Sequence, residues 1–474
     1  MIPADLVARF GAIAGAAHVT TTPEALRAHA HDALGRGHLP DVVVTPGTVP
    51  EVAAIARVCH DTRTPLVVRG AGTGYTGGSV PIRGGVVLAM ARFDRILEID
   101  EDNLLVVVQP NVVTGAVHAA VEARGLFYPP DPASLAQCAI GGNIAECAGG
   151  PRAFKYGTTR RYVLALEAVL ATGEVLRTGS KCVKDVAGYA LADLLVGSEG
   201  TLAIITEATL RLVPLPRSRR TLAATYATID AAAHAVGAIV RAGVVPAALE
   251  LIDAVSLGAV AAHLGRPMAP EGTAALLVVE VDGSDPAVVH DAALAVAACQ
   301  ASGATSVREA AGGADRESLW EARRELSYAL RRLAPRKINH DLVVPRGRVP
   351  ELFALVERIR GSYQLLVAAF GHAGDGNIHV NLLVHPEDAA EMARATAAEH
   401  ELFAGVVALD GAITGEHGVG FAKAAYLGLQ LSAAELALMA RVKQAFDPHG
   451  VLNPGKMWAT TAADLAALDA PIRP

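Results

Sequence analysis

Three histidines and one glutamate stand among glycines in the last third of the sequence, and these residue types can bind a metal ion. His372 and His379 flank the segment Gly-Asp-Gly at 374–376, and Glu416 and His417 follow within Gly-Glu-His-Gly. Gly-Asp-Gly is typical of a turn, so we expect a hairpin that brings the first two histidines together. Two histidines and a glutamate are a sufficient ligand set for zinc or a similar divalent ion. A single histidine would more often be a hydrogen-bonded structural residue, but the cluster favours a metal site.

The strand expected after this turn has polar residues at every second position. A period of two places Asn377, His379 and Asn381 on one face and the apolar residues between them on the other. Glu416 and His417 are neighbours, and in extended backbone their side chains would diverge. We therefore expect one of the two to bind the metal while the other faces a substrate.

A glycine-rich segment at residues 69–80, RGAGTGYTGGSV, follows a short apolar run. Glycine lets bare backbone N–H groups approach a phosphate closely. The spacing matches the Rossmann fingerprint, but Pro81 and an apolar run at 86–90 stand where that fold needs a helix. Gly78 occupies the position at which a P-loop needs lysine. The segment therefore predicts a phosphate cradle between two strands, outside both common nucleotide folds.

A third segment, residues 128–157, is dominated by small side chains and contains two Gly-Gly pairs. A loop of this length within a compact domain is usually functional or disordered, and its lack of charge runs argues against disorder. We interpret it as a second wall of the ligand site.

The elements that position these segments fall into two sets. Residues 1–40 are expected to be a helical lead-in, and residues 41–216 a two-lobed domain that contains the glycine loop. Over residues 217–445 single helices alternate with strands, which predicts an α+β or α/β layer with a sheet covered on one face. Residues 446–474 are a C-terminal segment.

Composition limits the partners and the setting. The 474 residues are 52% hydrophobic and 19% charged with a net charge of −7, which predicts a large core and no nucleic-acid partner. Five cysteines without a C-x-x-C pair indicate reduced thiols, as in the cytoplasm. No apolar run approaches the length of a transmembrane segment. A cytoplasmic protein, at most peripheral to a membrane, is expected.

Seven motifs together carry a family resemblance: RGAGTGYTGG, PPDPAS, IGGNIAE, GSEGTL, GHAGDGNIH, GEHGVG and a closing NPGK at 453–456. Over about residues 40–457 the chain resembles the FAD-linked D-2-hydroxyacid dehydrogenases of the D-lactate dehydrogenase and glycolate oxidase D-subunit type, in the vanillyl-alcohol-oxidase superfamily. The resemblance implies an α+β fold. It implies a two-lobed FAD-binding domain, a C-terminal cap domain with an antiparallel sheet covered by helices, and a tail that returns to the FAD site.

The resemblance also implies which residues hold FAD. Members that tether FAD covalently often have a histidine in the glycine loop, and Tyr75 there implies noncovalent FAD. The implied contacts lie in the glycine loop, in three further segments and in the tail: Arg69, Gly70, Ala71, Gly72, Thr73, Gly74, Tyr75, Thr76, Pro130, Asp131, Ala133, Ser134, Gly141, Gly142, Asn143, Glu199, Gly200, Ile204 and Asn453.

By the same resemblance, the catalytic groups lie in the second half of the chain. The metal, zinc in the first place and manganese or iron as alternatives, would be held by His372, His379 and Glu416. His417 would be the base that takes the proton of the substrate's 2-hydroxyl while hydride passes to flavin N5. The remaining groups would act on the substrate: Arg323 and Lys337 on its carboxylate, and Asn381 as part of the lining.

The implied reaction is oxidation of a small 2-hydroxy acid to the 2-oxo acid. D-Lactate is the first expectation, with D-2-hydroxyglutarate or glycolate as alternatives, and a quinone, a cytochrome or an electron-transfer flavoprotein would take the electrons. A homodimer and the inner face of a membrane are compatible settings. Two competing classes are non-redox ether-lipid synthesis by a related flavoenzyme, which the Glu416-His417 pair disfavours, and a metal-dependent hydrolase without flavin.

Overall fold

The computed structural model describes residues 2–469, which form two compact units. The first unit comprises the chain up to residue 149, residues 158–215 and the chain from 416 onwards. The second comprises residues 150–157 and 216–415. The sequence predicted a boundary at 216/217, beside the unit boundary at Pro216, and a later one at 445/446, where these units have none. The four predicted domains themselves stay a prediction.

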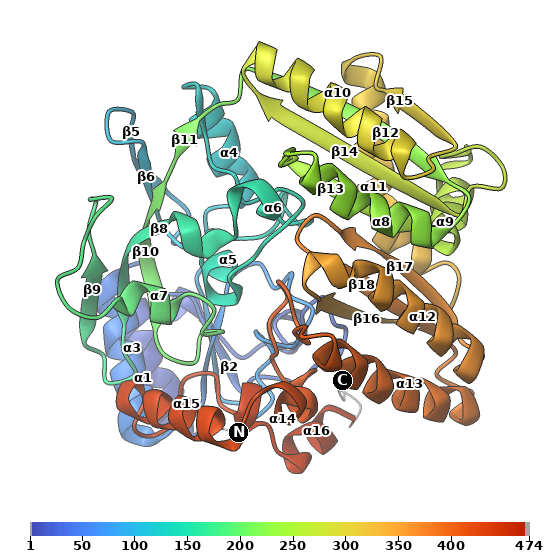
Figure 1. The fold of residues 1–474 in the computed structure, drawn as a ribbon. Coiled ribbons are helices and arrows are strands. Elements are labelled where there is room, and N and C mark those ends of the chain that lie inside the picture. Colours follow the sequence, from blue (N-terminus) through green and yellow to red (C-terminus); the bar gives the residue numbers. More distant parts are fainter. Residues whose placement is uncertain (1, 470–474) are drawn as a thin grey trace. The chain divides into compact units, whose positions relative to one another are not determined.

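Two sheets organise the first unit (Figure 1). The four-stranded sheet has the order β1-β2-β4-β3, with β1 Val19–Thr20, β2 Val42–Val44, β4 Val86–Ala89 and β3 Leu66–Arg69. The five-stranded sheet has the order β5-β6-β10-β8-β9, with β5 Ile96–Asp100, β6 Leu105–Val108, β10 Ile204–Arg211, β8 Val163–Val169 and β9 Val175–Gly179. A short pair joins β7 Leu126–Phe127 to β11 Val213–Pro214. These two main sheets confirm the predicted pair of lobes.

The helices of the first unit begin and end at recognisable sequence signals. Helix α3 begins after Thr48, whose hydroxyl accepts the N–H of Glu51, and ends at Arg63 in the left-handed region. Its apolar side packs with α1 in a core that also contains β2, β3 and β4. The helices are α1 Ala4–Ala14, α2 Pro23–Ala28, α3 Val49–Thr62, α4 Thr114–Glu122, α5 Ile140–Glu146, α7 Leu191–Leu195, α14 Leu427–Gln430, α15 Ala433–Phe446 and α16 Ala462–Asp469.

The glycine loop joins two strands, as predicted. Strands β3 and β4 are parallel neighbours, paired from Leu66 with Val86 to Arg69 with Ala89, and the loop runs between their ends without a helix. The small-residue segment at 128–157 differs from the predicted continuous loop, because α5 and α6 (Ala153–Tyr156) lie within it. Helix α5 has the sequence Ile-Gly-Gly-Asn-Ile-Ala-Glu, and its two glycines, which are poor helix formers, gave no indication of a helix.

The second unit is built on one antiparallel sheet of seven strands, in the order β15-β12-β14-β13-β17-β18-β16. The strands are β15 Ser306–Glu309, β12 Ser218–Tyr226, β14 Ala275–Gly283, β13 Ala248–Asp253, β17 Leu366–His372, β18 Asn377–Val384 and β16 Arg336–Val343. Strands β17 and β18 are the predicted hairpin, and their register pairs His372 with Asn377 and Phe370 with His379.

Helices cover both faces of this sheet, whereas the sequence predicted one covered face. Strand β18 is buried at all eight positions, and alternate side chains of a strand point to opposite faces, so each face must be covered. Helices α9 Ala254–Leu264 and α11 Gly313–Leu330 pack on one face. The row α10 Asp285–Ala301, α8 Ile229–Arg241, α12 Val349–Tyr363 and α13 Ala389–Ala408 packs on the other (Figure 1).

Candidate functional site

The glycine loop in the first unit has no room for side chains at its tightest points. Gly72 and Gly77 have φ of +70° and +80°, a backbone conformation that favours glycine. A Cβ at Gly77 would lie 1.9 Å from the ring of Phe421. Arg69 at the start of the loop donates to His31 O at 2.9 Å and to Ser79 Oγ at 3.4 Å. The glycines therefore leave backbone atoms at the surface of the loop, and Arg69 stabilises the loop at its start, as a phosphate cradle requires.

Three other predicted FAD contacts of the first unit take part in hydrogen bonds. Asn143 of α5 is buried and donates to Thr114 Oγ1 at 2.6 Å, and Pro130 O lies 2.9 Å from His118 Nε2. The carboxylate of Glu199 accepts the N–H groups of Val419 and Gly420, both at 2.7 Å. These hydrogen bonds hold the three residues in place, and their contact with FAD stays a prediction.

Two predicted contacts have contrasting surroundings. Ile204 is fully buried in the apolar core of the four-stranded sheet, so its side chain serves packing. Gly200 lies in the left-handed region with φ of +66°. The residues predicted around 130–134 and 141–142 stay predictions for FAD contact.

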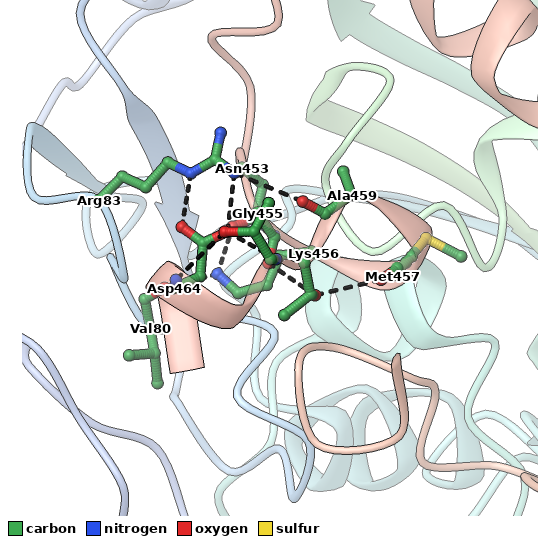
Figure 2. A network of polar contacts seen from close by, with 10 residues as sticks. Val80, Arg83, Asn453, Gly455, Lys456, Met457, Ala459 and Asp464 are labelled. Carbon is green, nitrogen blue, oxygen red and sulfur yellow. Dashed lines mark hydrogen bonds and ion pairs between the residues drawn. The ribbon is translucent and has the colours of Figure 1, made fainter. Parts of the chain in front are cut away.

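The C-terminal tail closes on the glycine loop (Figure 2). Asn453 Nδ2 donates to Gly78 O and to Glu199 O, both at 2.7 Å. Lys456 Nζ donates to Val80 O at 2.6 Å and to Asn453 Oδ1 at 3.0 Å. Burial lowers the pKa of Lys456 to about 7. The tail therefore fixes the far end of the loop through buried polar contacts, which the sequence indicated only at Asn453.

Buried acids surround this loop, and burial favours their neutral forms. Burial raises the pKa of Asp32 to about 6 and holds the pKa of Glu146 well above its ordinary value. Burial also raises the pKa of Glu199, although two backbone N–H groups oppose it. Because a raised pKa lessens the negative charge that these acids carry, they repel a phosphate group less than fully ionised carboxylates would.

Tyr75 of the glycine loop contacts His417. Their rings stack with centroids 5.4 Å apart, and Thr76 Oγ1 donates to His417 O at 3.3 Å. His417 Nε2 lies 3.8 Å from Glu416 Oε1, so these neighbouring side chains approach each other. The prediction that they diverge is wrong, because this glycine-flanked segment is bent and not extended. The structure thus brings the predicted base beside the predicted FAD loop.

The second unit carries a polar cluster on the sheet face under α11. His372 and His379 have ring centroids 5.3 Å apart, and a ring nitrogen of each lies within 4.8 Å of the other. His372 Nδ1 lies 2.5 Å from Glu250 Oε1. Arg323 of α11 donates from Nε to Glu250 Oε2, and its guanidinium lies 4.7 Å from the centre of the Phe370 ring. The hairpin prediction for the two histidines is therefore confirmed.

Glu250 is the charged centre of this cluster, and the sequence reasoning missed it. Its side chain is fully buried. Burial by itself would raise its pKa, but Arg323 and His372 outweigh burial and hold the pKa of Glu250 well below its usual range. The carboxylate is therefore ionised, and the Arg323 guanidinium and the His372 ring are its two partners.

Asp341 is a second missed residue. Its Oδ1 accepts Asn377 Nδ2 at 2.6 Å, and its Oδ2 accepts Gly415 N at 2.9 Å. One of its carboxylate oxygens lies within 4.8 Å of a ring nitrogen of His379, its register partner on β18. The alternation of β16 was visible in the sequence, but its pairing with β18 was not.

Asn381 and Lys337 lie further along the same face. Asn381 Oδ1 accepts Asn339 Nδ2 at 2.8 Å. Lys337 Nζ donates to Ser327 Oγ at 2.6 Å, and Ser327 lies one helical turn from Arg323 on α11. Burial, followed by the charge of Arg331, lowers the pKa of Lys337 to about 8. The two predicted carboxylate-binding residues are thus associated with the same side of one helix.

The donor set of this face fits a divalent cation. His372 and His379 offer imidazole nitrogens, and Asp341 adds a carboxylate beside them. Glu416, the third predicted ligand, belongs to the first unit and directly follows Gly415 in the chain. Its place in the metal shell stays a prediction.

Comparison with known families accounts for both units. Residues 40–179 match the model described as FAD binding domain, and residues 215–457 match FAD linked oxidases, C-terminal domain. The chain belongs to the FAD-linked oxidases. It is accordingly an FAD-linked oxidoreductase, and the predictions of the family, the fold class and FAD as cofactor are confirmed.

Among curated relatives, the glycolate oxidase subunit GlcD of Bacillus subtilis is 45% identical over 90% of this chain and 90% of its own length. A D-lactate dehydrogenase of Anaerostipes hadrus is 34% identical over 88% of this chain and 89% of its own. A solved p-cresol methylhydroxylase shares the fold, with a TM-score of 0.79 and 17% identity over 96% of each chain. Among residues 2–469, no helix has the length and apolarity needed to cross a membrane.

Proposed function

We propose that this FAD-linked oxidoreductase oxidises a D-2-hydroxy acid, D-lactate in the first place, to the 2-oxo acid with the help of a divalent metal. The observation that carries the proposal is the buried cluster of His372, His379 and Arg323 on one sheet face. It combines metal-ligating nitrogens with a cation suited to a carboxylate, which are the two groups that a 2-hydroxy acid needs. The names of the curated relatives support the same substrate class.

The chain's own residues would divide the work as follows. When bound, FAD supplies the hydride acceptor and the metal supplies a Lewis acid that lowers the pKa of the 2-hydroxyl. His372, His379 and Glu416 would hold the metal, and Arg323 with Lys337 would bind the substrate carboxylate. An imidazole nitrogen of His417 would take the hydroxyl proton. Tyr75, stacked on His417, supports this role because it limits the rotation of the imidazole.

Glycolate is the second candidate substrate. The relative with 45% identity is named a glycolate oxidase subunit, whereas relatives named D-lactate dehydrogenase are 32–37% identical. Glycolate lacks only the methyl group of lactate, so one pocket can accept both. The expected acceptor is a quinone, a cytochrome or an electron-transfer flavoprotein, and a cytoplasmic location is part of the proposal. A hydrolase without flavin does not fit a member of this family.

Anaerobic bleaching of the flavin tests the proposal. The purified protein, supplied with FAD and either Zn²⁺ or Mn²⁺, is mixed with D-lactate, L-lactate, glycolate and D-2-hydroxyglutarate in turn. We expect rapid loss of flavin absorbance with D-lactate or glycolate and none with L-lactate. Bleaching by none of the four acids, in protein with a full complement of FAD, would refute the proposed substrate class.

The same assay tests the base. His417→Ala should retain bound FAD and lose substrate-driven bleaching by about 10²–10⁴-fold, the usual contribution of general base catalysis. Tyr75→Phe keeps the aromatic ring and serves as the matched control, with bleaching close to that of the unmodified protein. Undiminished bleaching in His417→Ala would assign the proton transfer to another group.

A further inference from the structure

A buried carboxylate between His372 and Arg323 has a role that extends beyond charge balance. We propose that Glu250 is a positioning residue that orients a metal ligand and the substrate-binding arginine at the same time. The proposal rests on the proposed function, because it concerns the metal and the carboxylate of that reaction. In this proposal Glu250 itself contacts neither the metal nor the substrate carboxylate.

The register of β13 and β17 places Glu250 beside His372. Glu250 is the strand partner of His372, so the backbone pairing sets the two side chains on the same face of the sheet. Glu250 Oε1 lies 2.5 Å from His372 Nδ1. When Nδ1 donates to this carboxylate oxygen, the lone pair of the imidazole lies on Nε2. Glu250 thereby selects Nε2 of His372 as the ligand atom.

Glu250 holds Arg323 through its other carboxylate oxygen. Arg323 Nε donates to Glu250 Oε2, which leaves the two terminal guanidinium nitrogens for other partners. The ring of Phe370 lies under the guanidinium at 4.7 Å, and the same ring lies 5.5 Å from that of His379. Arg323 is therefore fixed on two sides by groups that also contact the histidine pair.

One carboxylate thus connects two binding functions, because each of its oxygens is committed to a different partner. Replacement of Glu250 by glutamine removes the negative charge and places an amide donor against one of two donors, the His372 ring or Arg323. Either choice breaks one of the two contacts. We therefore expect both metal affinity and substrate affinity to fall in this variant.

Glu280 provides a matched control in the same unit. It is buried on the neighbouring strand β14, on the same face as Glu250, and it also bonds to helix α11. Glu280 Oε2 accepts Trp320 Nε1 and Thr221 Oγ1, both at 2.9 Å. Neither of these hydrogen bonds involves a histidine. Glu280→Gln should therefore disturb packing about as much as Glu250→Gln does, without affecting a metal ligand.

The experiment measures Zn²⁺ affinity by competition with a chromogenic chelator in FAD-loaded protein that has first been stripped of metal. We expect Glu250→Gln to weaken Zn²⁺ binding 10–100-fold, the usual cost of losing a group that orients a metal-bound histidine. Glu280→Gln should stay within about twofold of the unmodified protein, since it orients no ligand. Glu250→Asp keeps the charge on a shorter side chain and should recover part of the loss. If Glu250→Gln does not fold, the reduced Zn²⁺ affinity of Glu250→Asp relative to Glu280→Gln carries the same test.

The effect of Glu250 on Arg323 is tested with oxalate, an unreactive dicarboxylate whose binding is followed through its effect on the flavin spectrum. Glu250→Gln should weaken oxalate binding in metal-free protein, where only Arg323 and its neighbours can respond. Zn²⁺ and oxalate affinities in Glu250→Gln equal to those in Glu280→Gln would overturn the inference. Flavin bleaching by hydroxy acids in the unmodified protein separates this result from a failure of the proposed function, because it does not involve the variants.

Discussion

Replacement of Asn453 by alanine should release the C-terminal tail from the glycine loop. The side chain donates two hydrogen bonds at 2.7 Å, to Gly78 O and Glu199 O, and accepts one from Lys456 at 3.0 Å. Asn453 also has φ of +42°, a left-handed conformation that asparagine tolerates better than alanine. Alanine removes all three hydrogen bonds and is less stable than asparagine in this backbone conformation.

The magnitude follows from these contacts. Two neutral hydrogen bonds contribute about 1 kcal/mol each, and a bond from a lysine contributes about 1.5–3 kcal/mol. The left-handed backbone adds roughly 1 kcal/mol against alanine. We therefore expect a loss of about 5 kcal/mol in tail docking, equivalent to roughly a several-thousandfold change in the docking equilibrium.

Hydrogen exchange of the tail amides is the assay, read together with the dissociation constant of FAD. Tail amides should exchange roughly several thousandfold faster in Asn453→Ala, since exchange follows the free energy of local opening. Asn103→Ala is the control, because Asn103 donates to Asp100 Oδ2 at 2.7 Å on an exposed turn. It should leave both measurements unchanged. Tail exchange in Asn453→Ala as slow as in the control would refute the reasoning.

Three further predictions concern other buried groups. Gly77→Ala should abolish FAD retention, because its Cβ would lie 1.9 Å from the Phe421 ring at a φ of +80°; full FAD content after gel filtration would contradict the cradle. Burial raises the pKa of Asp32 from 3.8 to about 6, so the folded state binds this proton more tightly than the unfolded state does. Its contribution to stability is present below pH 3.8 and lost as pH rises through about 6. Urea unfolding should therefore show Asp32→Asn to be stabilising by up to about 3 kcal/mol at pH 7 and neutral at pH 4, and equal effects at both would contradict this. Burial lowers the pKa of Lys337 to about 8, so kcat/KM for the hydroxy acid should fall as pH rises through about 8. Lys337→Arg should remove that fall. A flat pH profile in the unmodified protein would exclude Lys337 from carboxylate binding.

Local patterns in the sequence were sufficient for the elements that depend on neighbouring residues. The Gly-Asp-Gly turn and the alternation after it predicted the hairpin of His372 and His379, because turn type and side-chain alternation are set within a few residues. The glycine loop between two strands was predicted for the same reason, since the proline and apolar run after it exclude a helix. The order of the motifs was specific enough to identify the FAD-linked oxidase family.

The partners of these residues were decided only by the tertiary structure. Glu250 and Asp341 stand in strands without a recognisable motif, and nothing near them in the sequence marks them as partners of His372 and His379. The contact of Tyr75 with His417 joins residues that are far apart along the chain. Periodicity tells which face of a strand a side chain occupies, but the neighbour on that face depends on strand order and register. Those are set by packing of the whole sheet, which no local pattern contains.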